Sequence, residues 1–140
     1  MPPDERSYNV WVIARPAADV PGQWVAHCLD LDVMSQGDSL AHALKMVHEA
    51  ALIVMLDELN QDRDPLERRA PAEFFSELYG LFERGQKVTP EELTLAEHEG
   101  RIVAYATQFE LRFTIHTSEH EAAPRSMRPV PMGFAQQLAS

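Results

Sequence analysis

Short hydrophobic runs predict three strands at the start of the chain. Residues 8–15 are rich in β-branched and aromatic side chains and end at a proline, and both alternating sets of positions contain apolar residues. Residues 23–29 and 33–35 follow after short polar turns, which favour antiparallel neighbours. We therefore expect a three-stranded antiparallel meander whose first strand is at least partly covered on both faces.

A helix is expected directly after the meander. Gly37 is interpreted as a turn residue with positive φ, and Asp38 or Ser39 as the N-cap. Apolar positions then recur at intervals of three and four residues, which predicts one helix face packed on the sheet. The opposite face carries Ile53 and Leu56 in its second half, so that half must be covered as well, by the next segment or by a second subunit.

Residues 61–100 predict two further helices. The first, over 71–84, has proline in its first turn and ends at Gly85. The second begins at the Thr-Pro-Glu-Glu of residues 89–92, which is a capping box. The apolar stripe of the first helix consists of Phe74, Leu78, Leu81 and Phe82, with Phe75 and Tyr79 at its edge. We expect this aromatic stripe to cover the outer apolar half of the preceding helix.

Residues 101–116 are the longest predicted strand. Apolar and polar side chains alternate over 109–115, which indicates one buried and one wet face. A strand of this length would reach about 50 Å, more than a small sheet spans, so we expect a bulge near Thr107 and Gln108 or a protruding arm. Residues 117–140 show no periodicity and hold three prolines, and we expect them to be extended or disordered.

Together these elements give the order β-β-β-α-(α-α)-β. We expect an α+β fold, an antiparallel sheet with helices on one face. Residues 1–116 would form a single domain with a helical insertion at 61–100, followed by a tail at 117–140. A chain of 140 residues, 45% of them hydrophobic, is long enough for one self-sufficient core and too short for two comfortable domains.

The charge is strongly acidic and uneven. The net charge is −10, with −11 on residues 1–100 and +1 on residues 101–140. Proteins that grip nucleic acid need a basic face, so this balance disfavours them and favours a basic protein partner. The longest apolar run, residues 50–56, is far shorter than the ~20 residues of a membrane span, and the acidic N-terminus is unlike a signal peptide. We expect a cytoplasmic protein.

Two aspartates are the strongest candidates for chemistry. On an extended chain Asp30 and Asp32 would point the same way, as the ligands of a divalent metal would. Tight turns also favour aspartate, and we consider the turn the better interpretation. His27 and Cys28 are adjacent on a strand and face opposite sides, which argues against a thiolate–imidazole pair. The sequence contains no phosphate loop and no metalloprotease or serine-hydrolase motif, so we expect neither cofactor nor enzymatic activity.

Residues 24–44 resemble the signature of the HicB-like antitoxin family. The shared pattern is a strand with an aromatic residue and Ala-x-Cys, an acidic-apolar turn, a short strand ending in Ser-Gln-Gly-Asp-Ser, and a helix with Ala-Leu. The motif positions in this chain are Trp24, Asp30, Gly37 and Asp38. The resemblance extends over residues 8–60, and the strand predicted at 101–116 would close the same sheet.

The resemblance implies a truncated RNase-H-like fold without catalytic residues. In the family this fold binds and blocks a small HicA-type mRNA-cleaving toxin, although stand-alone members exist. Family antitoxins often append a DNA-binding module for repression of their own gene. Residues 61–140 show no such pattern, and the acidic stretch 61–100 weakens the expectation of DNA binding.

Three functions are therefore compared. We favour a non-enzymatic protein-binding module, because its acidic surface would complement a basic toxin. A DNA-binding regulator would use Arg112, Arg125 and Arg128, and a metal-dependent nuclease would use Asp30 and Asp32. We also expect a homo-oligomer, because the helices carry more apolar surface than a thin two-layer monomer hides. The candidate surface for a second copy or a toxin consists of Ile53, Leu56, Phe74, Phe75 and Tyr79.

Overall fold

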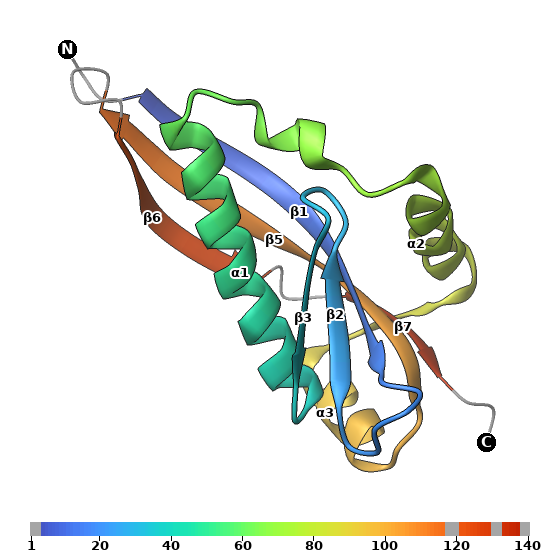
Figure 1. The fold of residues 1–140 in the computed structure, drawn as a ribbon. Helices are drawn as coiled ribbons and strands as arrows, with labels where there is room; N and C mark the ends of the chain where they lie inside the picture. The colour runs from blue at the N-terminus through green and yellow to red at the C-terminus, as the bar shows by residue number, and fades with distance from the viewer. Residues whose placement is uncertain (1–3, 117–120, 130–132, 138–140) are drawn as a thin grey trace.

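A computed structural model describes residues 4–116, 121–129 and 133–137 (Figure 1). For residues 115–116 and 121–129 it describes the backbone but not the side chains. Within these residues the chain forms one sheet with helices packed against it. The elements are β1 (Asp4–Pro16), β2 (Trp24–Cys28), β3 (Val33–Gly37), α1 (Leu40–Asn60), the 3₁₀ helix η1 (Pro65–Arg68), α2 (Ala72–Arg84), β4 (Gln86–Val88), α3 (Pro90–His98), β5 (Ile102–His116), β6 (Glu121–Pro129) and β7 (Gly133–Gln137).

The sheet is built around a long ribbon of β1 and β5. These two strands pair antiparallel from Asp4↔Ile115 to Ala14↔Tyr105. The strand order is β3-β2-β1-β5-β7-β4, and β6 pairs with β5 as well. Because β1 occupies one edge of β5, β7 and β6 follow one another along the other edge. The α+β class and the antiparallel meander of the first three strands are confirmed.

Local sequence signals set the helix starts as expected. Ser39 is the N-cap of α1, and its hydroxyl accepts a hydrogen bond from the His42 N–H at 3.0 Å. Thr89 and Glu92 form the reciprocal bonds of the capping box at the start of α3. The bulge expected near Thr107 and Gln108 is wrong, because β1 pairs with β5 without interruption there. The irregularities of β5 lie instead where it meets β7 and β6.

Helices cover both faces of the sheet, and the expectation of helices on one face is wrong. Along β1, Val10 and Val12 face the larger core, which α1 and α3 share, whereas Trp11 and Ile13 face α2. The same alternation divides β5. Both sets of positions on β1 are apolar, and each set is buried under a different helix (Figure 1).

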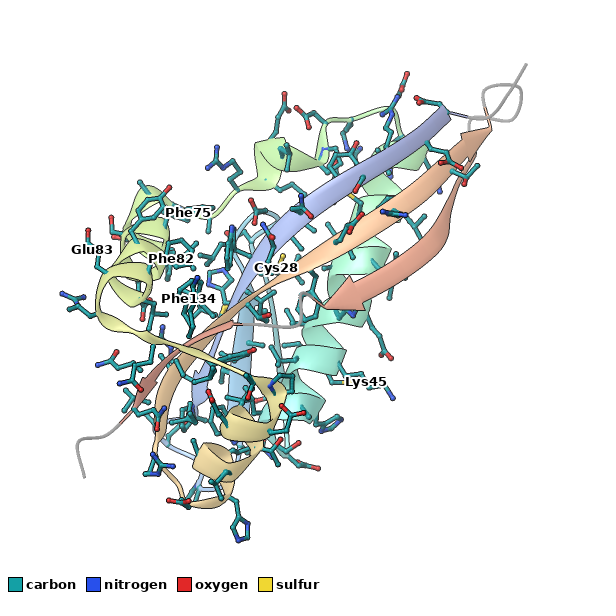
Figure 2. All side chains as sticks on the ribbon, turned by 180° about the vertical axis from the view of Figure 1, so that it is seen from behind. Cys28, Lys45, Phe75, Phe82, Glu83 and Phe134 are labelled. Carbon is teal, nitrogen blue, oxygen red and sulfur yellow. The ribbon has the colours of Figure 1, made fainter. Side chains whose placement is uncertain are left out.

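The segment 117–140 contributes β6 and β7 to the sheet, where the sequence predicted no strands. On β7, Phe134 lies 4.9 Å from Phe82 of α2 between ring centroids, and Phe82 lies 4.8 Å from Trp11. Figure 2 shows Phe75, Phe82 and Phe134 gathered on the α2 side of the molecule. This aromatic cluster joins the last strand to the second core.

Candidate binding site

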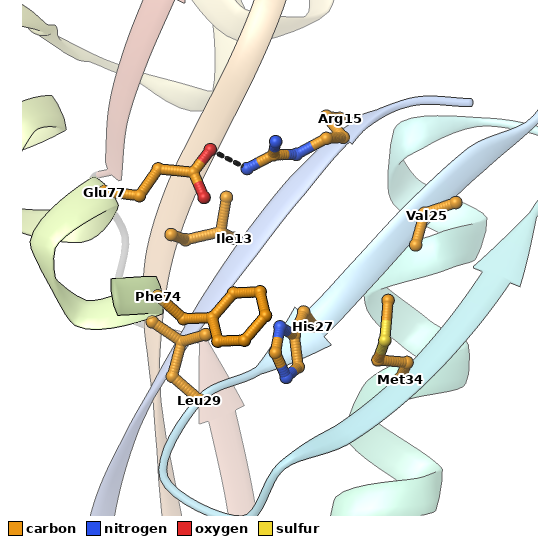
Figure 3. A pocket seen from close by; sticks show the side chains of 8 residues that line it. All are labelled: Ile13, Arg15, Val25, His27, Leu29, Met34, Phe74 and Glu77. Carbon is orange, nitrogen blue, oxygen red and sulfur yellow. Dashed lines mark hydrogen bonds and ion pairs between the residues drawn. The ribbon is translucent and has the colours of Figure 1, made fainter. Parts of the chain in front are cut away.

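A small pocket lies between α2 and the sheet face formed by β1, β2 and β3 (Figure 3). Its volume is about 170 Å³. An apolar cavity of about 150 Å³ holds one benzene-sized ring, whereas pockets for whole small-molecule ligands measure about 300–1,000 Å³. The pocket therefore fits a group the size of one side chain. It is lined by Ile13, Arg15, Val25, His27, Leu29, Met34, Phe74 and Glu77.

His27 forms the polar part of the pocket floor. Its Nε2 lies 2.7 Å from Asp32 Oδ1, and its ring meets Phe74 edge to face with centroids 5.0 Å apart. Asp32 has a positive φ of 52° in the turn between β2 and β3, a conformation that aspartate tolerates better than most residues. The turn thereby aims the carboxylate back at the imidazole, which is held between Asp32 and α2.

An ion pair between Arg15 and Glu77 closes another wall of the pocket, where the end of β1 meets α2 (Figure 3). Both side chains are partly exposed, and such pairs contribute only about 0–1 kcal/mol. The pair therefore positions α2 more than it stabilises the fold. On the opposite side the wall is Met34 of the edge strand β3, which is 61% exposed.

Asp30 and Asp32 have separate partners. Asp30 Oδ2 accepts a hydrogen bond from the backbone N–H of Trp11 at 2.6 Å, while Asp32 pairs with His27. Burial raises the pKa of the Asp30 carboxyl, against the opposing effects of the Trp11 N–H and the positive charge of Arg69. The residues that the structure describes contain no cluster of three or more His, Cys, Asp or Glu side chains arranged to hold a metal ion. These bonds fit the turn interpretation of the pair.

Cys28 lies on the face opposite to His27, as expected for neighbouring strand residues. Its side chain is fully buried in the larger core, and burial raises the pKa of the thiol to about 12. At neutral pH the group is a protonated thiol, which is a poor nucleophile. Its role in the structure is packing.

The motif residues of the resemblance hold β3 against the start of α1. Gly37 does not have positive φ, so that interpretation is wrong; instead a Cβ there would lie 2.5 Å from a backbone nitrogen in the first turn of α1. Trp24 pairs with Gly37 across the strands and packs on the larger core. Asp38 is not the N-cap, but its Oδ1 accepts a hydrogen bond from Gln23 Nε2 at 3.0 Å.

The five candidate surface residues fall on two opposite faces. Ile53 is 68% exposed on α1, and Leu56 is half-buried against the larger core. Phe74, Phe75 and Tyr79 belong to α2, on the other face of the sheet. The expectation that α2 covers the outer side of α1 is therefore wrong. The homo-oligomer stays a prediction, now with Ile53 separated from the aromatic residues of α2.

No family model, no curated protein and no solved structure matches the chain. The resemblance to HicB-like antitoxins therefore rests on residues 24–44 and on the elements that those residues form.

The remaining sequence candidates are only partly described. Arg112 donates to Glu110 on the same strand at 2.5 Å, and its side chain is 58% exposed. Arg125 and Arg128 lie on β6, and their side chains fall outside what the structure describes. In the described ranges, no helix combines the length and the apolar character needed to cross a membrane.

The pocket itself was missed by the sequence analysis. The sequence feature that pointed toward it is the pair of apolar residues Trp11 and Ile13 on the second face of β1. These residues indicated that this face is covered, but not which element covers it. His27 was considered only as a partner for Cys28. Its actual partner, Asp32, lies across the turn and becomes a neighbour only once the turn is formed.

Proposed function

We propose that this chain is a non-enzymatic, HicB-like module of truncated RNase-H-like fold that binds and neutralises a small basic HicA-like mRNA-cleaving toxin. The observation that carries the proposal is the continuity of residues 24–44. They form β2, β3 and the first turn of α1 as one unit, and Gly37 allows the close approach that holds it together. That unit lies at the open edge of the sheet, beside the pocket.

The charge distribution supports a basic partner. A protein that cleaves RNA presents a basic surface to the phosphate backbone, and the acidic surplus of residues 1–100 is complementary to such a surface. On α2, which contributes Phe74 and Glu77 to the pocket, Glu73 and Glu83 are exposed, and among the described residues neither has an ion-pair partner. These carboxylates are available to steer a basic protein toward this face.

The test is coexpression with any small basic protein that is found to be encoded beside this chain in its native genome. We expect the basic protein alone to arrest growth and cleave mRNA, and the coexpressed chain to restore growth and co-elute with it as a complex. Continued arrest at equal expression would refute the proposal. So would a neighbouring gene whose product lacks RNase activity.

A further inference from the structure

The β3 strand lacks the charged residues and prolines that commonly protect the edge of a sheet. In the described part of the chain, β2 is the only strand that pairs with β3. The β3 sequence Val-Met-Ser-Gln-Gly contains no charge and no proline, whereas natural edge strands are commonly protected by both. In contrast, β6 carries two prolines and two arginines, and β4 is three residues long with a central lysine. By residue type and length, β3 is therefore the least protected of these three strands.

The sheet face beside this edge is apolar and open. Met34 pairs with His27 across the strands and is 61% exposed, and Phe74 across the pocket is 36% exposed. A strand added beside β3 would place alternate side chains on this face. An apolar side chain opposite Met34 would remove the exposed thioether side chain from water.

An aspartate stands at each end of the edge. Asp32 precedes β3 and Asp38 follows it, and their side chains are 47% and 82% exposed. On an added strand the two residues opposite these aspartates are six positions apart, whichever way the strand runs. Lysine or arginine at both positions would face a carboxylate, which stabilises a cross-strand pair and selects for charge.

A second copy of this chain fits the same edge poorly. In an antiparallel pair centred on Ser35, Asp32 of one copy would face Asp38 of the other at both ends. Like charges directly opposite one another destabilise a sheet, and a net charge of −10 on each copy adds repulsion. The edge thus favours a basic heterologous segment over self-pairing.

We propose that β3 is a strand-addition site for an extended segment of a basic partner. The segment carries Lys or Arg opposite Asp32 and Asp38 and an apolar side chain opposite Met34. Main-chain hydrogen bonds to the edge supply affinity, and the alternate side chains supply selectivity. As the docking site of the toxin this inference rests on the proposed function, whereas the strand site itself can be tested without a toxin.

Seven-residue peptides provide the direct test on the full chain. One library has lysine at both ends and a varied centre, and a matched library has glutamate at both ends. We expect lysine-ended peptides with an apolar third or fifth residue to bind at least tenfold more tightly and to slow amide exchange in Val33–Gly37. Equal binding of the two libraries, protection outside β3, or no binding at millimolar peptide would overturn the proposal.

Two lysine substitutions of exposed apolar residues locate the site. Met34→Lys is expected to weaken binding of the lysine-ended peptides at least tenfold, because it places a positive charge beside them. Leu95→Lys on α3, where the side chain is similarly exposed at 56%, is expected to leave binding within twofold. Circular dichroism and thermal unfolding of both variants establish that they are folded. Loss of binding in both variants, or in neither, would contradict the proposal.

The same pair separates the strand site from the toxin function. If Met34→Lys blocks peptide binding but the unmodified chain never rescues growth, the antitoxin proposal is wrong and the strand site stands. If the unmodified chain rescues growth and Met34→Lys does so equally well, the toxin binds elsewhere and β3 is not its docking site.

Discussion

The backbone N–H of Trp11 donates to Asp30 Oδ2 at 2.6 Å, just beyond the last residue pair of β1 and β2. In return the Trp11 carbonyl accepts from the Leu29 N–H at 2.9 Å. The carboxylate therefore takes the place of a backbone acceptor where the strands separate. It satisfies a donor that would otherwise lose its partner, at the cost of placing a charge in a partly buried position.

Replacing Asp30 distinguishes the acceptor from the charge. Asp30→Asn keeps an oxygen for the Trp11 N–H and removes the desolvated charge, so we expect a free energy of unfolding at pH 7 equal to or above that of the unmodified chain. Asp30→Ala leaves the donor without this acceptor and should lower it by about 1–3 kcal/mol. Urea unfolding of both variants measures the difference. An equal loss in both would show that the charge itself is required.

The same substitution has a pH signature. Because burial raises the pKa of Asp30 in the folded protein above its ordinary value of 3.8, its contribution to stability is fully present below that value and falls as pH rises through the folded pKa. Asp30→Asn removes this dependence. We expect the free energy of unfolding of Asp30→Asn to increase relative to that of the unmodified chain as pH rises from 3 to 7. A difference between the two proteins that stays constant over this range would be inconsistent with the raised pKa.

Gly37 offers a second test, of the approach between β3 and α1. Gly37→Ala would push a methyl group into backbone atoms that cannot easily move, and we expect a loss of about 1–3 kcal/mol. Gly80→Ala in α2 is the matched control. Its Cβ meets only the flexible end of Arg84, and alanine favours a helix over glycine by up to about 1 kcal/mol. The midpoint temperature of thermal unfolding should therefore fall for Gly37→Ala and rise for Gly80→Ala.

His48 predicts a loss of stability in acid. Its ring stacks on Phe109 with centroids 4.4 Å apart, and its Nε2 is buried without a hydrogen-bond partner among the described residues. Burial lowers the pKa of His48 below the ordinary 6.5, so the unfolded chain takes up the proton first. The contribution of neutral His48 to stability is fully present above pH 6.5 and is lost as pH falls through the lowered pKa of the folded protein. His48→Gln should flatten this part of the unfolding curve, and an unchanged slope would contradict the assignment.

Phe134 tests whether β7 belongs to the cooperative fold. Its ring packs on Phe82 while the side chain is only half-buried, so Phe134→Ala should cost about 2 kcal/mol, less than the ~3–5 for a fully buried phenylalanine. Gln136→Ala, an exposed position of the same strand, should have almost no effect. Denaturant midpoints of the two variants give the comparison. Equal midpoints would mean that β7 adds little to stability.

Three features that depend only on residues close together in the sequence were predicted correctly. The capping box at Thr89, the cap at Ser39 and the alternation of β5 all depend on neighbours a few residues away, and all three occur as predicted. The face covered by α2 was not predictable in this way. Its stripe shows that the helix must pack, but both the outer side of α1 and the second face of β1 offered an apolar partner.

The last two strands show a different limit. In β6 and β7 the side chains do not alternate in polarity, and both strands pair with β5 through their backbones. Pairing of this kind depends on the edge that the neighbouring strand leaves open, which a propensity scale does not encode. The pocket was hidden for the same reason, because its walls come from β1, β2, β3 and α2, which meet only in the folded chain.

The pairing of β1 with β5 also sets a waiting time during synthesis. Asp4 has to find Ile115, so the first strand emerges long before its main partner exists. At about 5–20 residues per second, roughly 5–20 s pass before β5 is available. During that interval one edge of β1 and the apolar Trp11 and Ile13 are unprotected, and closing so long a loop makes folding intrinsically slow. A chaperone that shields the nascent first strand would therefore raise the yield of this protein more than one that acts after release.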